Sequence, residues 1–417
     1  MKKFFVLMML ACLLLIGCEK KQPLVYNVNK SAELREYESE VEAESAFEEE
    51  KIRQSIAAEE SRAAEEASAH PAAWSKRQNG KERTRVRGIY LTDATAGSDR
   101  MESIIGHIDE TELNAVVIDI KNDEGRIAYR MNAETVQALG AERDTITDIQ
   151  SLLQRLKAHG IYAIARIVSF RDPYLETVKP EWMYRLPDGS VFHDSAGMAW
   201  VDPYQRAYWD YISEIISACA ADGFDEVQLD YVRFCTERGM QDVVFPEEET
   251  QGRSKTEIIT EFVRHISDRA AEAGIFLSTD VFGTIIGSYV DSHAVGQDYA
   301  LLSEAVDYMC PMIYPSHYGD GNFGIAHPDT EPYRTILFAL GASRKALEAE
   351  PESGQRATVR PWLQGFTASY LSNYIRYGPE QLRAQIQAVY DSGYEEWLVW
   401  NASNNYDWDA FPREENG

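Results

Sequence analysis

The feature that most constrains the fold is an alternation of short apolar runs and helical stretches, repeated eight times from residue 84 onward. The apolar runs occupy residues 86–92, 114–121, 162–170, 226–234, 276–283, 306–314, 360–367 and 395–403. Helices are expected near residues 99–110, 146–159, 204–223, 254–273, 331–349 and 379–392. Strands that alternate with helices form βαβ units with parallel strands. Eight such units can close on themselves, so the sequence predicts an α/β fold, a (β/α)₈ TIM barrel over residues 83–417.

An open, doubly wound sheet is the alternative arrangement of the same units. The barrel is favoured because the count reaches eight and no GxGxxG motif follows the first run. Long connections follow several expected strands, at residues 171–205, 235–252, 283–300 and 315–330. The active sites of such barrels are built from strand-to-helix loops at the C-terminal face. These long loops therefore predict which end of the barrel carries the site.

The N-terminal residues 1–18, MKKFFVLMMLACLLLIGC, have the pattern of a secretory signal: two lysines precede an apolar run that is short for a membrane span. The closing LIGC resembles a bacterial lipoprotein box, in which Cys18 would be lipidated; the alternative is an ordinary signal peptide with an incidental cysteine. Residues 19–82 are acidic and rich in Ala and Glu, with few apolar residues for a core. We expect a spacer there, and a protein anchored to a membrane of the bacterial cell envelope through Cys18.

The overall charge argues against nucleic acid as a partner. The chain has 68 acidic and 41 basic residues, a formal net charge of -27, whereas binding to phosphates needs a basic surface. The five cysteines form no CxxC pair, and the histidines form no HxH or HExxH motif. The sequence therefore predicts neither a metal site nor a cofactor.

Polar side chains gather at the C-terminal ends of the expected strands. Side chains alternate along a strand, so residues two apart, such as Gln228 and Asp230, face the same way. We expect such groups to point into the site. The candidate substrate-binding residues are Asp119, Lys121, Arg166, Gln228, Arg233, Tyr314, His317, Gln364, Trp400 and Asn401.

Asp230 and Asp280 are the candidate catalytic pair. Neighbouring strands lie about 4.8 Å apart, so two carboxyl groups on them can reach one small substrate. Glycoside hydrolysis needs one acid to protonate the leaving oxygen and one carboxylate to attack or to activate water. Arg166, Lys121 and Arg233 would compensate the negative charge. The alternative is a ring of ion pairs that only stabilises the mouth of the barrel.

Several segments resemble a bacterial family of glycoside hydrolases with a TIM-barrel domain, over about residues 84–410. They are VRGIYLT, LNAVVIDIKNDEG, FDEVQLDYVRF, DVFG and MCPMIYPSHY. The resemblance implies the barrel fold and a hydrolase directed at carbohydrates. More distantly, the chain resembles sugar hydrolases whose nucleophile is an aspartate that ends strand four, which implies this role for Asp230.

The general acid is left open by the resemblance. Amylase-like enzymes have a glutamate at the end of strand five, where this chain has the shorter Asp280. Galactosidase-like enzymes have the acid at the end of strand six, where this chain has Tyr314. The leading hypothesis is a glycoside hydrolase that acts on a polysaccharide or glycoconjugate. The alternatives are a non-catalytic carbohydrate-binding barrel at the cell envelope and a different hydrolase such as a deacetylase.

Overall fold

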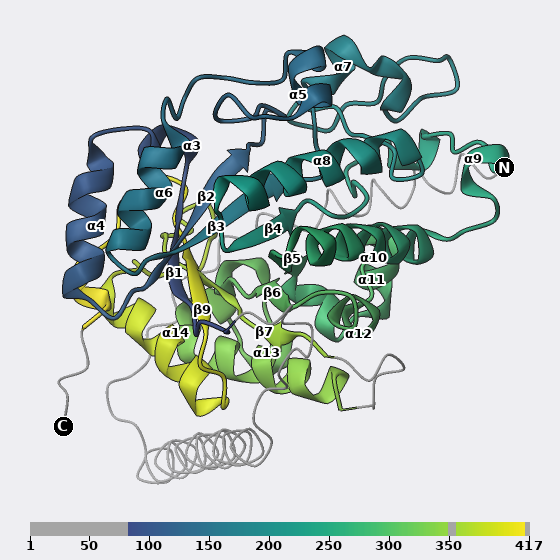
Figure 1. Ribbon diagram of the computed structural model, residues 1–417. Coiled ribbons are helices and arrows are strands. Elements are labelled where there is room, and N and C mark those ends of the chain that lie inside the picture. Colours follow the sequence, from purple (N-terminus) through teal and green to yellow (C-terminus); the bar gives the residue numbers. More distant parts are fainter. Residues whose placement is uncertain (1–81, 349–355, 413–417) are drawn as a thin grey trace, which may run out of the picture. The chain divides into compact units, whose positions relative to one another are not determined.

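A computed structural model describes residues 82–348 and 356–412, in which the predicted barrel is confirmed. Cys18 and nearly all of the expected spacer lie outside the described residues. All strand pairings in the ring are parallel, and β9 pairs with β1 to close it (Figure 1). The strands are β1 Arg87–Leu91, β2 Ala115–Lys121, β3 Tyr162–Val168, β4 Glu226–Asp230, β5 Phe276–Phe282, β6 Tyr308–Met312, β7 Thr358–Val359, β8 Trp362–Gln364 and β9 Trp397–Trp400.

The seventh predicted strand is divided into β7 and β8. Pro361 lies between them and cannot donate a backbone hydrogen bond, so a ladder is interrupted there. β7 pairs with β6, whereas β8 pairs with β9 and touches β6 through Met312 and Trp362. The ring stays closed because the backbone oxygen of Pro361 accepts a hydrogen bond of 2.9 Å from Leu398 N.

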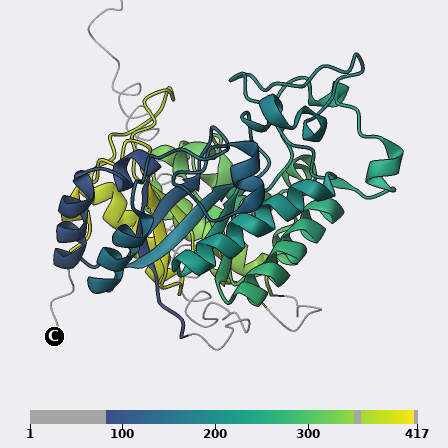
Figure 2. The same cartoon turned by 45° about the horizontal axis from the view of Figure 1, so that its top comes forward.

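Helices surround the strands, as Figures 1 and 2 show. The predicted helices appear as α4 Arg100–Glu110, α6 Ile149–Ala158, α8 Arg206–Asp222, α10 Lys255–Ala273, α13 Pro332–Ala346 and α14 Pro379–Asp391. Shorter helices lie in the connections: α3 Asp93–Ala96, α5 Glu134–Leu139, α7 Leu175–Val178, α9 Glu247–Thr250, α11 Tyr289–Val295 and α12 Tyr299–Ser303. After β9, the described chain has only the short 3₁₀ turn η7, Trp408–Ala410.

The long helix α10 illustrates how local sequence sets these elements. Ser254 caps its N-terminus in a capping box with Glu257, and Gly274 ends it with a left-handed φ of 71°. The apolar residues of α10 recur at helical spacing, so one face is buried. Phe262 on this face packs against Trp209 of α8, with ring centroids 5.5 Å apart.

Alternation along the strands divides the core into two apolar clusters. Outward-facing residues such as Val116 and Ile118 belong to the larger cluster, which includes apolar residues of the helices. Inward-facing residues such as Val117 and Ile164 belong to a smaller cluster, which fills the barrel interior. The described barrel interior is therefore packed, as is usual for such barrels.

A buried ion cluster lies among the residues that begin the strands. Arg360 donates to Glu226 of β4 at 2.9 Å and to Glu396, just before β9, at 3.0 Å. All three side chains are buried, and the Arg360 guanidinium lies 3.9 Å from the ring centroid of Tyr308. Because these residues occupy the N-terminal ends of their strands, the cluster lies at the barrel floor, opposite the expected site.

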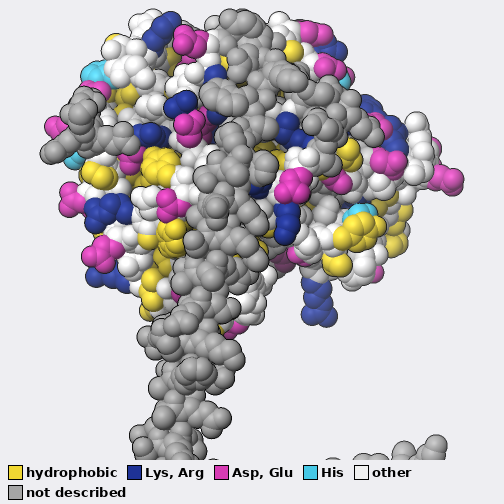
Figure 3. All heavy atoms as spheres, turned by 90° about the horizontal axis from the view of Figure 1, so that it is seen from below, with side chains coloured by type: hydrophobic (Ala, Val, Ile, Leu, Met, Phe, Trp, Pro, Cys, Tyr) yellow, Lys and Arg dark blue, Asp and Glu magenta, His cyan; other side chains and the backbone are white. Residues whose placement is uncertain are grey.

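The described surface carries charges of both signs. On the face in Figure 3, Lys and Arg side chains are interspersed with Asp and Glu side chains. None of the helices within the described residues is long and apolar enough to cross a membrane.

Candidate active site

A cavity of about 210 Å³ opens at the C-terminal ends of the strands. Seven of the predicted site residues line it: Arg166, Asp230, Arg233, Asp280, Tyr314, His317 and Trp400. They come from β3, β4, β5, β9 and the segments after β4 and β6. The barrel topology thus brings together side chains that are far apart in the sequence.

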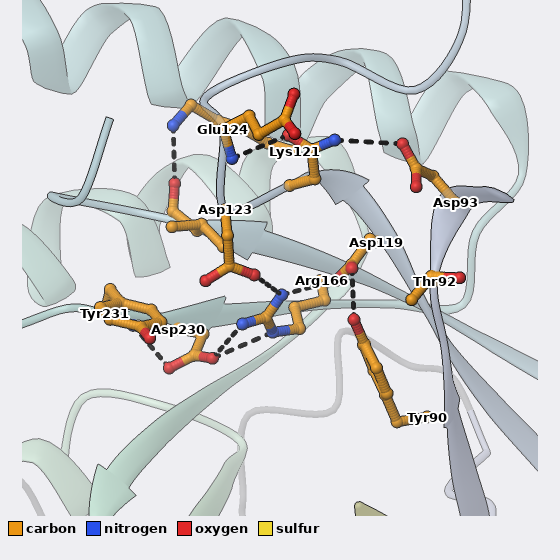
Figure 4. A network of polar contacts seen from close by, with 12 residues as sticks. Tyr90, Thr92, Asp93, Asp119, Lys121, Asp123, Glu124, Arg166, Asp230 and Tyr231 are labelled. Carbon is orange, nitrogen blue, oxygen red and sulfur yellow. Dashed lines mark hydrogen bonds and ion pairs between the residues drawn. The ribbon is translucent and has the colours of Figure 1, made fainter. Parts of the chain in front are cut away.

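Arg166 is the centre of a polar network at one wall of the cavity (Figure 4). Its Nε and Nη2 donate to Asp230 Oδ2 at 2.9 and 2.5 Å. Its Nη1 donates to Asp119 Oδ1 at 2.5 Å and lies 3.3 Å from Asp123 Oδ2. These charge-assisted hydrogen bonds hold Asp230 in place and stabilise a negative charge on it.

Asp119 lies beneath the cavity rather than in its lining. Its Oδ2 accepts a 2.5 Å hydrogen bond from the Tyr90 hydroxyl, and the Tyr90 ring stacks on Trp400 with centroids 3.9 Å apart. Burial raises the pKa of Asp119 to about 6, although Arg166 acts in the opposite direction. Asp119 is therefore a positioning residue that orients Arg166, Tyr90 and, through Tyr90, Trp400.

Asp280 has a different environment from Asp230. Its Oδ1 accepts a 2.7 Å hydrogen bond from the indole Nε1 of Trp362, and its side chain is only 2% exposed. No Lys, Arg or His of the described residues forms an ion pair with it. Burial, and then the nearby charge of Asp230, raise its pKa well above the ordinary range. The two carboxyl groups thus differ in the way that acid and base roles require.

The chain leaves β4 through a strained turn. Tyr231 has φ of +51°, in the left-handed region that residues other than glycine rarely occupy. Its hydroxyl accepts from Arg171 Nη1 at 2.8 Å, and its ring meets Trp200 edge-on at 5.8 Å between centroids. The turn breaks the alternation of the strand, so Asp230, Tyr231 and Arg233 all face one cavity.

Lys121 does not line the cavity, contrary to the prediction from alternation. A bulge between Asp119 and Lys121 places Lys121 opposite Ile167, whose side chain belongs to the outer apolar cluster. There the Lys121 ammonium pairs with Asp172 at 2.7 Å and donates to the Val168 carbonyl at 2.8 Å. Both charged side chains are fully buried, so this is a structural ion pair.

The three amides predicted for the site also lie outside its lining. Gln228 is one layer deeper in the barrel and donates to Cys310 Sγ at 3.4 Å. Gln364 donates to Asp329 Oδ1 at 2.9 Å, and Asn401 donates to the Gly365 carbonyl at 2.7 Å. Gln364 and Asn401 line an adjoining groove, which meets the cavity at Phe366.

The domain matches a protein family described as "Putative glycosyl hydrolase domain" over residues 88–406. The chain belongs to this family. The match begins at the second residue of β1 and includes all of the other eight strands and both candidate catalytic aspartates. Family membership supports a glycoside hydrolase-like function.

Among solved structures, a hypothetical protein from Ruminiclostridium thermocellum is 35% identical, over 46% of this chain and 97% of that chain, with a TM-score of 0.43. The glycoside hydrolase domain of PgaB (BpsB) from Bordetella bronchiseptica is 13% identical, over 78% of this chain and 98% of that one, with a TM-score of 0.56. A β-galactosidase from Marinomonas ef1 is 12% identical, over 76% and 54% of the two chains, with a TM-score of 0.51. The last two share the fold of this glycosyl hydrolase domain. No curated protein matches the chain.

Sequence reasoning missed six residues that line the cavity of this glycosyl hydrolase domain: Asp123, Tyr231, Phe282, Met312, Trp362 and Phe366. The sequence could have identified Trp362, because it lies two residues before Gln364 in the same predicted strand. Residues two apart along a strand face the same way, so both were candidates for the cavity. Asp123 follows β2 directly in the loop NDEG, where an acidic residue is easily taken for a solvated turn.

Proposed function

We propose that this domain hydrolyses O-glycosidic bonds of a polysaccharide or glycoconjugate, with Asp230 and Asp280 as the catalytic pair. The observation that carries the proposal is the contrast between these two carboxyl groups at one cavity. Arg166 donates two hydrogen bonds to Asp230, whereas Asp280 is buried and, within residues 82–348 and 356–412, accepts its hydrogen bond from the neutral Trp362 indole.

The contrast supports a division of roles. Asp280, whose pKa burial raises well above its ordinary value, is the acid that delivers its proton to the glycosidic oxygen as the bond to the sugar breaks. Asp230, paired with Arg166, attacks the anomeric carbon or takes a proton from the attacking water. Arg166 holds Asp230 in position for either step.

The aromatic lining supports a sugar as the substrate. Trp400, Tyr314 and Phe366 contribute rings to the cavity wall, and the Tyr314 and Phe366 centroids lie 5.8 Å apart with the rings nearly perpendicular. The apolar faces of a sugar ring pack on such aromatic rings, while its hydroxyl groups bind the polar side chains. A cavity of about 210 Å³ has room for about one sugar ring.

The test measures reducing-sugar release from a panel of polysaccharides by the wild-type protein, Asp230→Asn and Asp280→Asn. We expect each variant to lose about 10²- to 10⁴-fold in turnover. Aryl glycosides with a good leaving group need little protonation, so they should rescue bond cleavage in Asp280→Asn but not in Asp230→Asn. The matched control is Asp188→Asn, in an exposed turn away from the cavity.

The outcomes separate the candidate functions. Near wild-type release by both variants would contradict the assignment, and Asp320, after β6, would be the next acid to test. Glycan binding without release by the wild-type protein would instead favour a non-catalytic carbohydrate-binding barrel.

We also propose that the domain works at the bacterial cell envelope, anchored to a membrane by lipid on Cys18. The support is the signal-like pattern of residues 1–18 and the LIGC that ends it. A single acyl chain binds membranes weakly, and stable anchoring takes more than one chain.

A further inference from the structure

Arg233 is a charged cavity residue that the proposed mechanism does not use. Its guanidinium carbon lies 4.6 Å from the ring centroid of Phe282, 4.9 Å from that of Trp200 and 5.3 Å from that of Tyr231. Three rings of the cavity region therefore hold the guanidinium plane. Two of those rings, Phe282 and Tyr231, are themselves part of the cavity lining, so the packing fixes the guanidinium at the cavity wall.

The charge of Arg233 has no carboxylate partner within the described ion pairs. Its one described hydrogen bond, 2.9 Å long, goes from Nη1 to the carbonyl of its neighbour Phe234. Burial lowers the pKa of Arg233, which means that its surroundings oppose the charge. Arg166, in contrast, contacts three carboxylates in the same cavity region. A desolvated guanidinium with free donors is stabilised when an anion binds it.

A strained backbone conformation at Tyr231 places Arg233 in the cavity. Regular alternation from Asp230 would turn Arg233 to the opposite face, away from the substrate. The left-handed Tyr231 reverses this and brings Arg233 into the lining. A strained residue next to a candidate catalytic aspartate indicates that the placement of Arg233 has a functional use.

The remaining charges of the cavity restrict where an anion could bind. Asp123 and Asp230 line the cavity and repel a negative group, and Arg166 is already engaged by Asp230 and Asp123. Arg233 is the lining cation, among the described residues, that keeps donors available for a ligand. Its forked donors suit the two or three oxygens of a carboxylate or sulfate group.

We propose that Arg233 binds an anionic substituent of the substrate, so that the domain acts on acidic glycans such as those built from carboxylated sugars. The proposal rests on the proposed function, because it assumes that a glycan occupies the cavity. The anionic group contacts the Arg233 guanidinium beside Phe282, while the bond to be cleaved lies between Asp230 and Asp280. Arg233 is thus a specificity residue rather than a catalytic one.

The experiment measures binding by isothermal titration calorimetry on the full chain, so that it does not depend on turnover. The probes are oligosaccharide fragments of acidic polysaccharides, each compared with its carboxyl-reduced counterpart, together with sulfated fragments. We expect the wild-type protein to bind an acidic fragment roughly ten- to one-hundred-fold more tightly than its reduced counterpart. Arg233→Gln should remove this preference and leave the affinity for the reduced fragment within about twofold.

Two further variants sharpen the test. Arg233→Lys keeps the charge but loses the forked geometry, so it should keep only part of the preference. Arg206→Gln is the matched control, because Arg206 also lies over an aromatic ring, 3.7 Å from the Trp209 centroid, but is outside the cavity. It should bind both fragments like the wild-type protein.

Each outcome supports or overturns the anion site at Arg233. Preference for a carboxylated or for a sulfated fragment supports the anion site and identifies which group it takes. Equal binding of acidic and reduced fragments by the wild-type protein overturns the proposal, whether or not the variants fold. Equal loss of both fragments in Arg233→Gln assigns the residue a packing role and also overturns it. Failure of every glycan to bind would instead contradict the proposed function.

Discussion

Replacement of Asp119 by Asn tests whether burial or ion pairing dominates beneath the active site. Asp119 is 3% exposed, and its Oδ1 lies 2.5 Å from Arg166 Nη1. A salt bridge alone would lower the pKa of this carboxyl. Burial outweighs the salt bridge, however, and raises the pKa from 3.8 to about 6. The two effects predict opposite changes of stability with pH.

The direction in which the free energy of unfolding changes with pH follows from proton binding. Between about pH 4 and pH 6, the folded protein keeps the proton on Asp119 while the unfolded chain has released it. The folded state therefore binds more protons, and the free energy of unfolding falls as the pH rises through this window. At about 1.36 kcal/mol per pH unit, the gap between 3.8 and about 6 corresponds to about 3 kcal/mol.

The assay is urea denaturation of the wild-type protein and Asp119→Asn at several pH values from 4 to 7. Asn cannot ionise, so the difference in free energy of unfolding isolates the titration of Asp119. We expect the advantage of the wild-type protein over the variant to shrink by about 2.4 kcal/mol between pH 4 and pH 7, because the unfolded chain is still partly protonated at pH 4.

The control for this experiment is Asp188→Asn. Hydrogen bonds from Ser190 lower the pKa of the exposed Asp188 carboxyl, so the wild-type advantage over this variant should grow slightly with pH. If the advantage over Asp119→Asn also grows between pH 4 and pH 6, then pairing with Arg166 outweighs burial, and our account of Asp119 is wrong.

Three further predictions concern other parts of the chain. Trp362→Phe removes the hydrogen bond that stabilises the Asp280 carboxylate, so the basic limb of the pH–rate profile on a cleaved glycan should move to higher pH; a move to lower pH would contradict this. Arg360→Met leaves Glu226 buried without its cation, and should lower the free energy of unfolding by about 3–5 kcal/mol in urea titrations. A loss below about 1 kcal/mol, as for an exposed ion pair, would show that the floor cluster is not stabilising. Cys18→Ser should move the protein from the membrane fraction to the soluble fraction, and a soluble wild-type protein would refute lipid anchoring.

The strands could be predicted from the sequence because parallel barrel strands are covered on both sides and read as nearly continuous apolar runs. Their pairing order also follows, since closure of eight units leaves one arrangement. The division of the seventh strand at Pro361 had a visible cause in the missing backbone donor. These features depend on residue type and spacing alone.

Side-chain direction was predictable only where the backbone stays regular. The alternation rule correctly turns Asp230 and Arg166 inward but fails at Lys121, because nothing in the residue types marks the bulge after Asp119. Arg233 reaches the cavity only through the left-handed conformation of Tyr231, an unusual one for a tyrosine. Backbone irregularities of this kind are set by tertiary contacts, which a local pattern does not contain.

The two candidate catalytic carboxyl groups are tied to opposite halves of the chain. Asp230 takes its guanidinium partner from β3, whereas Asp280 takes its indole partner from β8. The seam between the halves is the β4–β5 pairing, which runs from Glu226 opposite Phe276 to Leu229 opposite Thr279. A small opening of this seam would widen the gap between the carboxyl groups while each kept its own partner. Because that gap governs the stereochemical course of glycoside hydrolysis, the stiffness of this strand pairing would, under the proposed function, influence whether the configuration is retained or inverted.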